Sequence, residues 1–169
     1  QVLYMDDGNT PMRPLGAVDK SFYLIGVGAS AGGLDAIKQL IGQVPPDFSH
    51  SLVIVQHISP DYKSLMSEIL GRETSLSVLE VTDDMPVQPG HIYLIPPRSN
   101  LVIQGTAEDS SAELHPDPEN KDRTGLRFSL VDPTPRPALN LPIDVFLNSL
   151  SEAVADRAIA VVLSGSGSD

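Results

Sequence analysis

The chain has 169 residues, 41% of them hydrophobic and 20% charged, which suits one globular domain with a buried core. It carries 22 acidic residues against 11 basic ones, and the net charge of -11 argues against general nucleic-acid binding. It contains no cysteine, which excludes disulfides and thiolate chemistry, and no apolar run approaches the roughly 20 residues that a membrane span requires.

The first 21 residues are polar and lack the basic start and apolar stretch of a signal peptide. We expect residues 1–21 to form a tail or linker and residues 22–169 to form the domain. The domain begins with an apolar run at 22–27, which predicts a buried strand. Helical spacing of apolar residues predicts a helix at 32–41, and a second buried strand follows at 52–56. Strand, helix and strand with short connections form a βαβ unit with a right-handed crossover.

The rest of the chain continues this alternation. The expected elements are a helix near 64–70, strands at 77–81, 91–95 and 101–104, an exposed loop at 105–125, a strand at 127–131, a helix at 142–154 and a buried strand at 158–163. Within the loop we expect a short strand near Leu114, with 127–131 as its antiparallel partner. The fold class predicted is α/β, a three-layer, doubly wound, mostly parallel sheet with an antiparallel excursion.

Three predicted strands end in polar or glycine-rich loops. Ser30 follows the first strand, His57 follows the second, and Asp169 closes the Gly-Ser loop after the last. Because carboxyl ends of parallel strands share one edge of a sheet, topology alone can bring these residues together.

The three residue types are those of a serine hydrolase. A serine hydroxyl becomes a nucleophile when an imidazole takes its proton, and a carboxylate orients that imidazole. Residues 28–32 fit G-x-S-x-G, in which small residues allow a sharp strand-to-helix turn that exposes the hydroxyl. A helix that begins near Gly32 would also point free backbone amides at a developing oxyanion.

Each of these residues also has a simpler interpretation. The Gly-Ala-Ser-Ala-Gly segment could form a plain tight turn or a phosphate loop, His57 could be a hydrogen-bonded structural histidine, and Asp169 a turn residue. We expect the other three histidines, His50, His91 and His115, to be solvated. The pair Asp83-Asp84 is more typical of surface charge than of acid/base catalysis, and no His, Asp or Glu cluster has metal-ligand spacing.

Five segments together resemble the catalytic domain of the chemotaxis receptor protein-glutamate methylesterase family. They are IGVGASAGGLDAI, LVIVQHISPDYKSLMSEIL, VQPGHIYLIPP, RPALNLPIDVFLNSL and AIAVVLSGSGSD, and they occur in the family's order. The resemblance implies Ser30 as nucleophile, His57 as general base and then acid, and Asp169 as the orienting carboxylate. It also implies hydrolysis of γ-glutamyl methyl esters on the cytoplasmic part of methyl-accepting chemoreceptors, with glutamine deamidation in some members. No cofactor is implied, and the expected location is cytoplasmic, without membrane insertion.

The sequence departs from the commonest family pattern near the implied oxyanion region. Ala31 stands where many members carry threonine, beside Gly32, and Ser166 stands where many carry methionine. Ala31 and the Gly-Ser-Asp ending look more like versions fused to a receptor methyltransferase. We expect no receiver domain like that of the stand-alone enzyme in the first 21 residues, because they are too few to form one. Because the family domain continues past the aspartate, we expect the chain as written to be weakly active or inactive.

Two other functions are compatible with the same residues. Gly26-x-Gly28-x-x-Ala31 resembles the dinucleotide-binding fingerprint, although the second strand ends in Gln56-His57 instead of an acidic residue. The second is a non-catalytic module that keeps the fold and binds receptor helices.

Two interpretations apply to each of four further residues. Arg136 and Asp144 flank a helix start, where they either pair to pin the helix or touch substrate. Tyr62 and Met66 follow His57 and could line the rim of the site, with core packing favoured for Met66.

Overall fold

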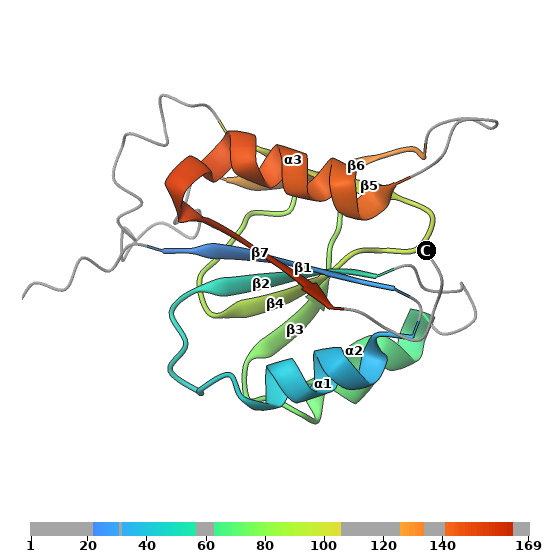
Figure 1. The fold of residues 1–169 in the computed structure, drawn as a ribbon, viewed down its shortest axis with the longest axis vertical. Helices are drawn as coiled ribbons and strands as arrows, with labels where there is room; N and C mark the ends of the chain where they lie inside the picture. The colour runs from blue at the N-terminus through green and yellow to red at the C-terminus, as the bar shows by residue number, and fades with distance from the viewer. Residues whose placement is uncertain (1–21, 31, 57–62, 106–125, 134–140, 164–169) are drawn as a thin grey trace, which may run out of the picture.

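The computed structural model describes residues 22–30, 32–56, 63–105, 126–133 and 141–163. The elements are β1 (Leu24–Ala29), α1 (Leu34–Gly42), β2 (Ser51–Gln56), α2 (Lys63–Gly71), β3 (Ser77–Glu80), β4 (His91–Leu94), β5 (Asn100–Gln104), β6 (Arg127–Val131), α3 (Pro142–Val154), a short 3-10 helix (Ala155–Arg157) and β7 (Ala158–Leu163). The main sheet is parallel, with strand order β3-β4-β2-β1-β7. Figure 1 shows α1 and α2 on one side of this sheet and α3 with β5 and β6 on the other.

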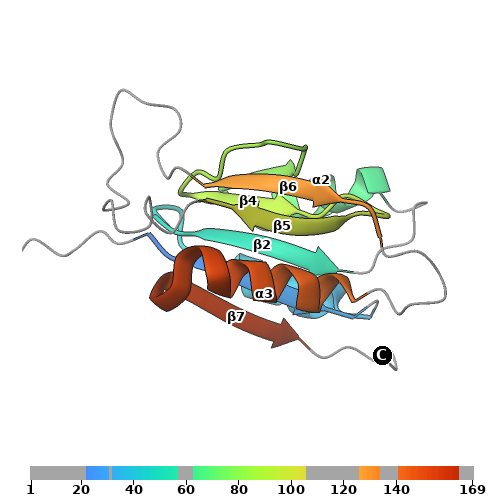
Figure 2. The ribbon, with the colours of Figure 1, turned by 90° about the horizontal axis from the view of Figure 1, so that it is seen from above.

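The three-layer α/β class predicted from the sequence is confirmed. The antiparallel excursion is the pair β5-β6, which forms a separate two-stranded sheet. Figure 2 shows this pair beside α3 and over the main sheet. The pairing expected between 127–131 and a strand near Leu114 lies outside the described residues, as does the tail at 1–21.

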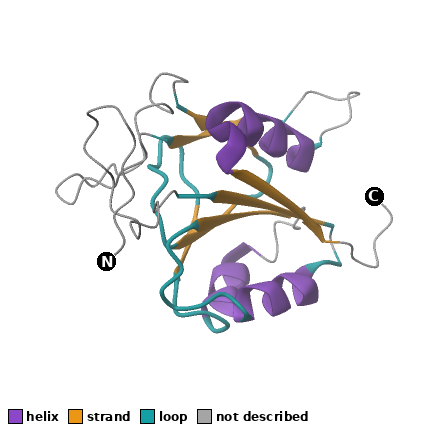
Figure 3. Ribbon diagram, turned by 60° about the vertical axis from the view of Figure 1, so that its left-hand side comes forward, coloured by secondary structure: helices purple, strands orange, loops and turns teal. Residues whose placement is uncertain are grey.

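Strand β2 is buried on both faces, and its side chains alternate between two cores. Leu52 and Ile54 face the core that α1 and α2 cover, whereas Val53 and Val55 face the core that α3, β5 and β6 cover. All four side chains are at most 2% exposed. A strand covered on both faces carries a continuous apolar run instead of an alternating pattern. The layers on either side of the sheet are visible in Figure 3.

Two glycines of β1 allow α3 to lie directly on the sheet. A Cβ atom added at Gly26 would come within 2.8 Å of the Leu147 side chain, and one at Gly28 within 2.6 Å of Cγ2 of Ile143. Both distances are too short for a real Cβ contact, so a larger residue would force the Leu147 or Ile143 side chain to move. The glycines of this motif are therefore explained by close helix–strand packing.

We predict that Gly28→Ala destabilises the fold by about 1–3 kcal/mol, because the added methyl group overpacks the contact with Ile143. Urea unfolding measures the change. An Ile143→Ala exchange removes the opposing methyl group, so the double variant should lose less stability than the sum of the single variants. Gly42→Ala is the control, since no atom lies within 4 Å of its added Cβ. Equal effects at Gly28 and Gly42 would contradict the packing account.

Strand β7 differs from the prediction of a buried strand. Ile159 is 41% exposed and Val162 is 71% exposed. The physical reason is position: β7 pairs with β1 on one side only and forms an edge of the sheet among the described strands. An apolar run predicts a strand but does not reveal what covers it, so the prediction of burial was wrong here.

Backbone hydrogen bonds connect the loop between β3 and β4 to β6 and to the residue that precedes it. The amide of Phe128 donates to the carbonyl of Met85 at 2.8 Å, and the amide of Val87 donates to the carbonyl of Leu126 at 2.9 Å. These bonds join the main sheet to the β5-β6 pair.

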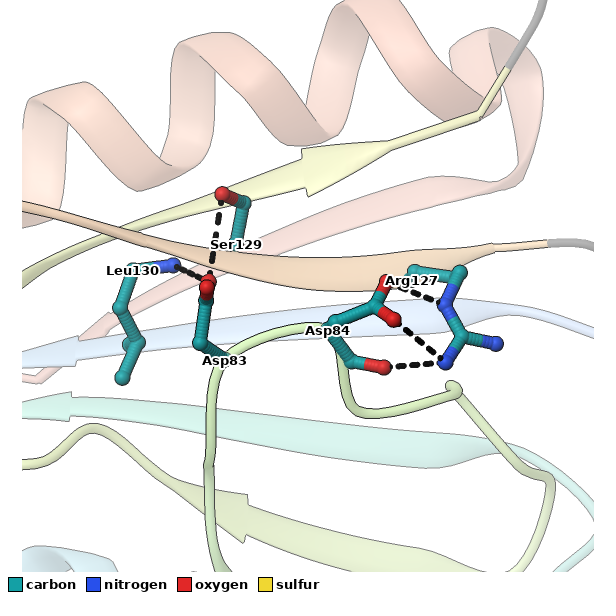
Figure 4. A network of polar contacts seen from close by, with 5 residues as sticks. All are labelled: Asp83, Asp84, Arg127, Ser129 and Leu130. Carbon is teal, nitrogen blue, oxygen red and sulfur yellow. Dashed lines mark hydrogen bonds and ion pairs between the residues drawn. The ribbon is translucent and has the colours of Figure 1, made fainter.

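Asp83 and Asp84 strengthen this connection, as Figure 4 shows. Asp83 Oδ1 accepts a hydrogen bond from the Leu130 amide at 2.9 Å. The Asp84 carboxylate accepts from Arg127 Nε at 2.6 Å and from Nη2 at 3.1 Å. Both aspartates are exposed surface charges, as the sequence predicted, and here they tie a loop to a strand.

The Arg127 hydrogen bond lowers the pKa of Asp84 from its ordinary value. Because the folded-state pKa is depressed, this contribution to stability is present above the unfolded pKa of about 3.9 and is lost as the pH falls through the folded value. We predict that Arg127→Gln returns the Asp84 pKa to its ordinary range, as measured by NMR titration of the carboxyl carbon. Lys38→Gln, which removes a cation paired with Glu73 at 3.4 Å, is the control and should leave Asp84 unchanged. An unaltered Asp84 titration in Arg127→Gln would contradict this explanation.

Candidate active site

Three neighbouring strands end level with one another at one edge of the sheet. The register pairs Ala29, the last residue of β1, with Gln56 at the end of β2 and with Leu163 at the end of β7. Adjacent strands lie about 4.8 Å apart. Ser30 and His57 are the next residues in sequence after two of these strand ends, and the segment that contains Asp169 follows the third.

Ser30 begins a tight turn from β1 into α1. The amide of Gly33 donates to the carbonyl of Ser30 at 2.9 Å, and Gly33 is also the N-cap residue of α1. A Cβ atom at Gly33 would lie 2.8 Å from Cβ of Ala29 and 3.1 Å from the carbonyl oxygen of Ser30. The helix starts at Leu34, two residues later than predicted, and the Gly33 amide is used within the turn. That amide is therefore not free to bind an oxyanion in this conformation.

The hydroxyl of Ser30 is buried, and no hydrogen-bond partner is found for Oγ among the described residues. The prediction that the turn exposes this hydroxyl is therefore wrong for the conformation seen. The remainder of Ser30 is partly exposed, and rotation between staggered χ1 positions moves Oγ without moving the backbone. The segments that follow β2 and β7 at this edge lie outside the described residues, so they are not included in this statement about partners.

Gln56 contacts Ser30 directly, and the sequence did not predict this contact. Its carboxamide Nε2 donates to the carbonyl oxygen of Ser30 at 2.9 Å, and the side chain is only 6% exposed. The sequence does contain one signal that could have indicated this contact: a polar residue ends an otherwise apolar predicted strand, immediately before His57.

Of the predicted site residues, Ser30 and Gly32 belong to the described part of the chain. The others, Ala31, His57, Arg136, Ser166 and Asp169, lie outside it, so their convergence on Ser30 remains a prediction.

Of the predicted neighbours of the site, Asp144 and Met66 belong to the described part of the chain. Asp144 is exposed in the first turn of α3, and its pairing with Arg136 is untested. Met66 is 7% exposed and packs in the core with α1, as favoured, whereas Tyr62 lies outside the described residues.

His50 and His91, which were expected to be solvated, are partly exposed, and both rings also pack against aromatic neighbours. His50 Nδ1 accepts a hydrogen bond from the Tyr23 amide at 3.3 Å, and partial burial lowers its pKa. His91 stacks on Tyr93 with ring centroids 5.8 Å apart. Both histidines lie at the amino-terminal ends of β2 and β4, away from Ser30. His115 is outside the described residues.

The described residues contain neither a candidate metal site nor a candidate membrane span. No group of three or more His, Cys, Asp or Glu side chains there could hold a metal ion. Within the same residues, no helix is both long and apolar enough to traverse a bilayer.

Comparison with known proteins gives concordant results for sequence and structure. Residues 25–169 match the family model described as CheB methylesterase. A protein-glutamate methylesterase/protein-glutamine glutaminase from Saccharophagus degradans is 26% identical over 161 residues, which is 95% of this chain and 39% of that protein. A protein of the same description from Nitrosomonas europaea is 31% identical over 147 residues, which is 86% of this chain and 36% of that protein.

Among solved structures, the CheB methylesterase catalytic domain of Thermotoga maritima matches with a TM-score of 0.70 and 25% identity, over 88% of this chain and 70% of that chain. The chain thus spans well under half the length of the curated relatives that it matches. The family model covers most of the chain, and the fold agrees with a solved member. The chain belongs to the CheB methylesterase family.

Proposed function

We propose that this chain is the catalytic domain of a serine hydrolase that removes methyl esters from glutamate side chains of chemoreceptors and deamidates receptor glutamines. The observation that carries the proposal is the level ending of β1, β2 and β7, from which Ser30, His57 and the segment with Asp169 continue. Family membership supports the same activity, since the relatives are named protein-glutamate methylesterase/protein-glutamine glutaminase.

The proposed mechanism uses side chains of the protein alone. Ser30 Oγ attacks the ester carbonyl while His57 accepts its proton, and Asp169 orients the imidazole and stabilises its cation. His57 then protonates the departing methoxide, so methanol leaves and an acyl-enzyme remains. Water, activated by His57, hydrolyses the acyl-enzyme to release the glutamate carboxylate and regenerate Ser30.

The dinucleotide-binding alternative is not favoured. The close packing of α3 on β1 explains Gly26 and Gly28 without a ligand. The second strand ends in Gln56, whose amide donates to the Ser30 carbonyl, where the fingerprint expects an acidic residue for the ribose.

The test is release of methanol from receptor helix fragments that carry glutamate methyl esters, measured with the full-length natural protein. We expect methanol from methylated fragments and none from the same fragments with free glutamates. Ammonia release from fragments with glutamine at those positions tests deamidation. Absence of methanol from every methylated fragment would refute the proposal.

The same proposal includes the substrate protein and the cellular compartment. The substrate class is a methyl-accepting chemoreceptor or a similar helical protein, and the site of action is the cytoplasm. A receptor methyltransferase domain fused to this chain would place opposing methylation and demethylation activities in one protein.

A further inference from the structure

We propose that Gln56 is a positioning residue for the nucleophile: its carboxamide holds the backbone carbonyl of Ser30 and so fixes the direction in which the serine side chain leaves the turn. This inference rests on the proposed function of Ser30 and adds to it a residue outside the expected triad.

The contact is set by the register of the sheet. Gln56 ends β2 directly opposite Ala29, so its side chain reaches one residue further along the neighbouring chain to Ser30. The Ser30 carbonyl then accepts two hydrogen bonds, from Gly33 N at 2.9 Å and from Gln56 Nε2 at 2.9 Å. Two bonds use both lone pairs of a carbonyl oxygen.

Holding this carbonyl from two directions fixes the peptide plane that follows Ser30. The Gly33 bond alone is local to the turn and moves with it. The Gln56 bond ties the same oxygen to the neighbouring strand, which is rigid because β2 is buried and paired on both sides. The direction of the Ser30 Cα–Cβ bond is therefore fixed relative to the sheet. Gln56, which makes this contact, is also the residue before His57.

Among the described residues, the Gln56 carboxamide uses its donor and not its acceptor. Oε1 of Gln56 is buried, and no partner for it is found among the described residues. A methionine has nearly the same length and volume and would fill the same space. What the methionine lacks is the donor to the Ser30 carbonyl.

The experiment compares Gln56→Met and Gln56→Glu with the wild type in the full-length protein, with kcat and KM for methyl-ester hydrolysis measured separately across pH. Gln56→Met removes the donor, and we expect kcat to fall about 10- to 100-fold with KM little changed, because small errors in nucleophile placement cost this much. Gln39→Met changes an exposed glutamine of α1 and is the control, with wild-type kcat expected.

Gln56→Glu keeps the shape and makes the donor depend on pH. A protonated carboxyl can donate to the Ser30 carbonyl, whereas an ionised one repels it, and burial raises the pKa of such a group. Wild-type activity should rise with pH as the imidazole of His57 becomes neutral. The Gln56→Glu enzyme should add a falling limb at higher pH, giving a bell-shaped profile that a purely structural role would not produce.

The outcomes separate the two proposals. A lower kcat for Gln56→Met with a bell-shaped Gln56→Glu profile supports the positioning role. Wild-type kcat per folded molecule in both variants, with only a lower melting temperature, overturns it. If Gln56→Met does not fold, the Gln56→Glu profile decides the question. A wild-type protein without Ser30-dependent hydrolysis overturns the proposed function, and this inference falls with it.

Discussion

Replacing Ser30 with alanine is expected to lower the hydrolysis of glutamate methyl esters at least about a thousandfold, because no other group replaces the lost nucleophile. The fold should tolerate the change well. Ser30 Oγ has no hydrogen-bond partner among the described residues, so its removal breaks no bond seen there. The measurement is methanol release at saturating substrate, alongside thermal unfolding of both proteins.

Ser49→Ala provides the matched control, since Ser49 is an exposed serine outside the helices and strands. It should retain wild-type turnover and stability. Retention of more than about a tenth of wild-type activity by Ser30→Ala would argue for water attack or for another nucleophile, and would remove Ser30 from the mechanism.

The second large effect is expected at His57. His57→Gln keeps a side chain of similar size but cannot accept the serine proton, so kcat should fall about a thousandfold. Wild-type activity should rise with pH as the imidazole of His57 loses its proton, because only the neutral ring acts as a base. The variant should lose this rise together with its activity.

His91→Gln serves as the control for a general histidine effect. His91 begins β4 and stacks on Tyr93, at the amino-terminal end of the strand. Its replacement should leave the pH profile of hydrolysis unchanged. If His57→Gln kept the rising limb, a different group would be the base.

The sequence predicted the order and type of the elements because most of them carry strong local signals. Strand β2 is apolar at Leu52, Val53, Ile54 and Val55, and both faces are buried as such a run implies. The helical spacing of Ile143, Phe146 and Leu150 predicted α3 with the bounds observed. These signals lie within single segments, so no knowledge of tertiary contacts was needed.

Features that depend on neighbours were predicted less well. The exposure of Val162 follows from the place of β7 at the edge of the sheet formed by the described strands, which an apolar run does not encode. The aromatic packing of His50 and His91 likewise depends on side chains brought together by the fold.

The predictions for the active site divide in the same way: local features were predicted, and features that depend on tertiary contacts were not. The G-x-S-x-G pattern located the turn at Ser30, because small residues at fixed spacing are a local requirement. The role of Gln56 could not be predicted, since it depends on the register that sets β2 against β1. The burial of the Ser30 hydroxyl was also beyond the pattern, because a motif specifies backbone shape and leaves the χ1 rotamer open.

The most direct test of Ser30 as the nucleophile is reaction of the full-length protein with a fluorophosphonate, followed by mass spectrometry of its peptides. A serine activated by a base should give a single adduct, on Ser30, with loss of methanol release in proportion to labelling. No adduct in a protein that hydrolyses the ester, or an adduct on a different residue, would contradict the account.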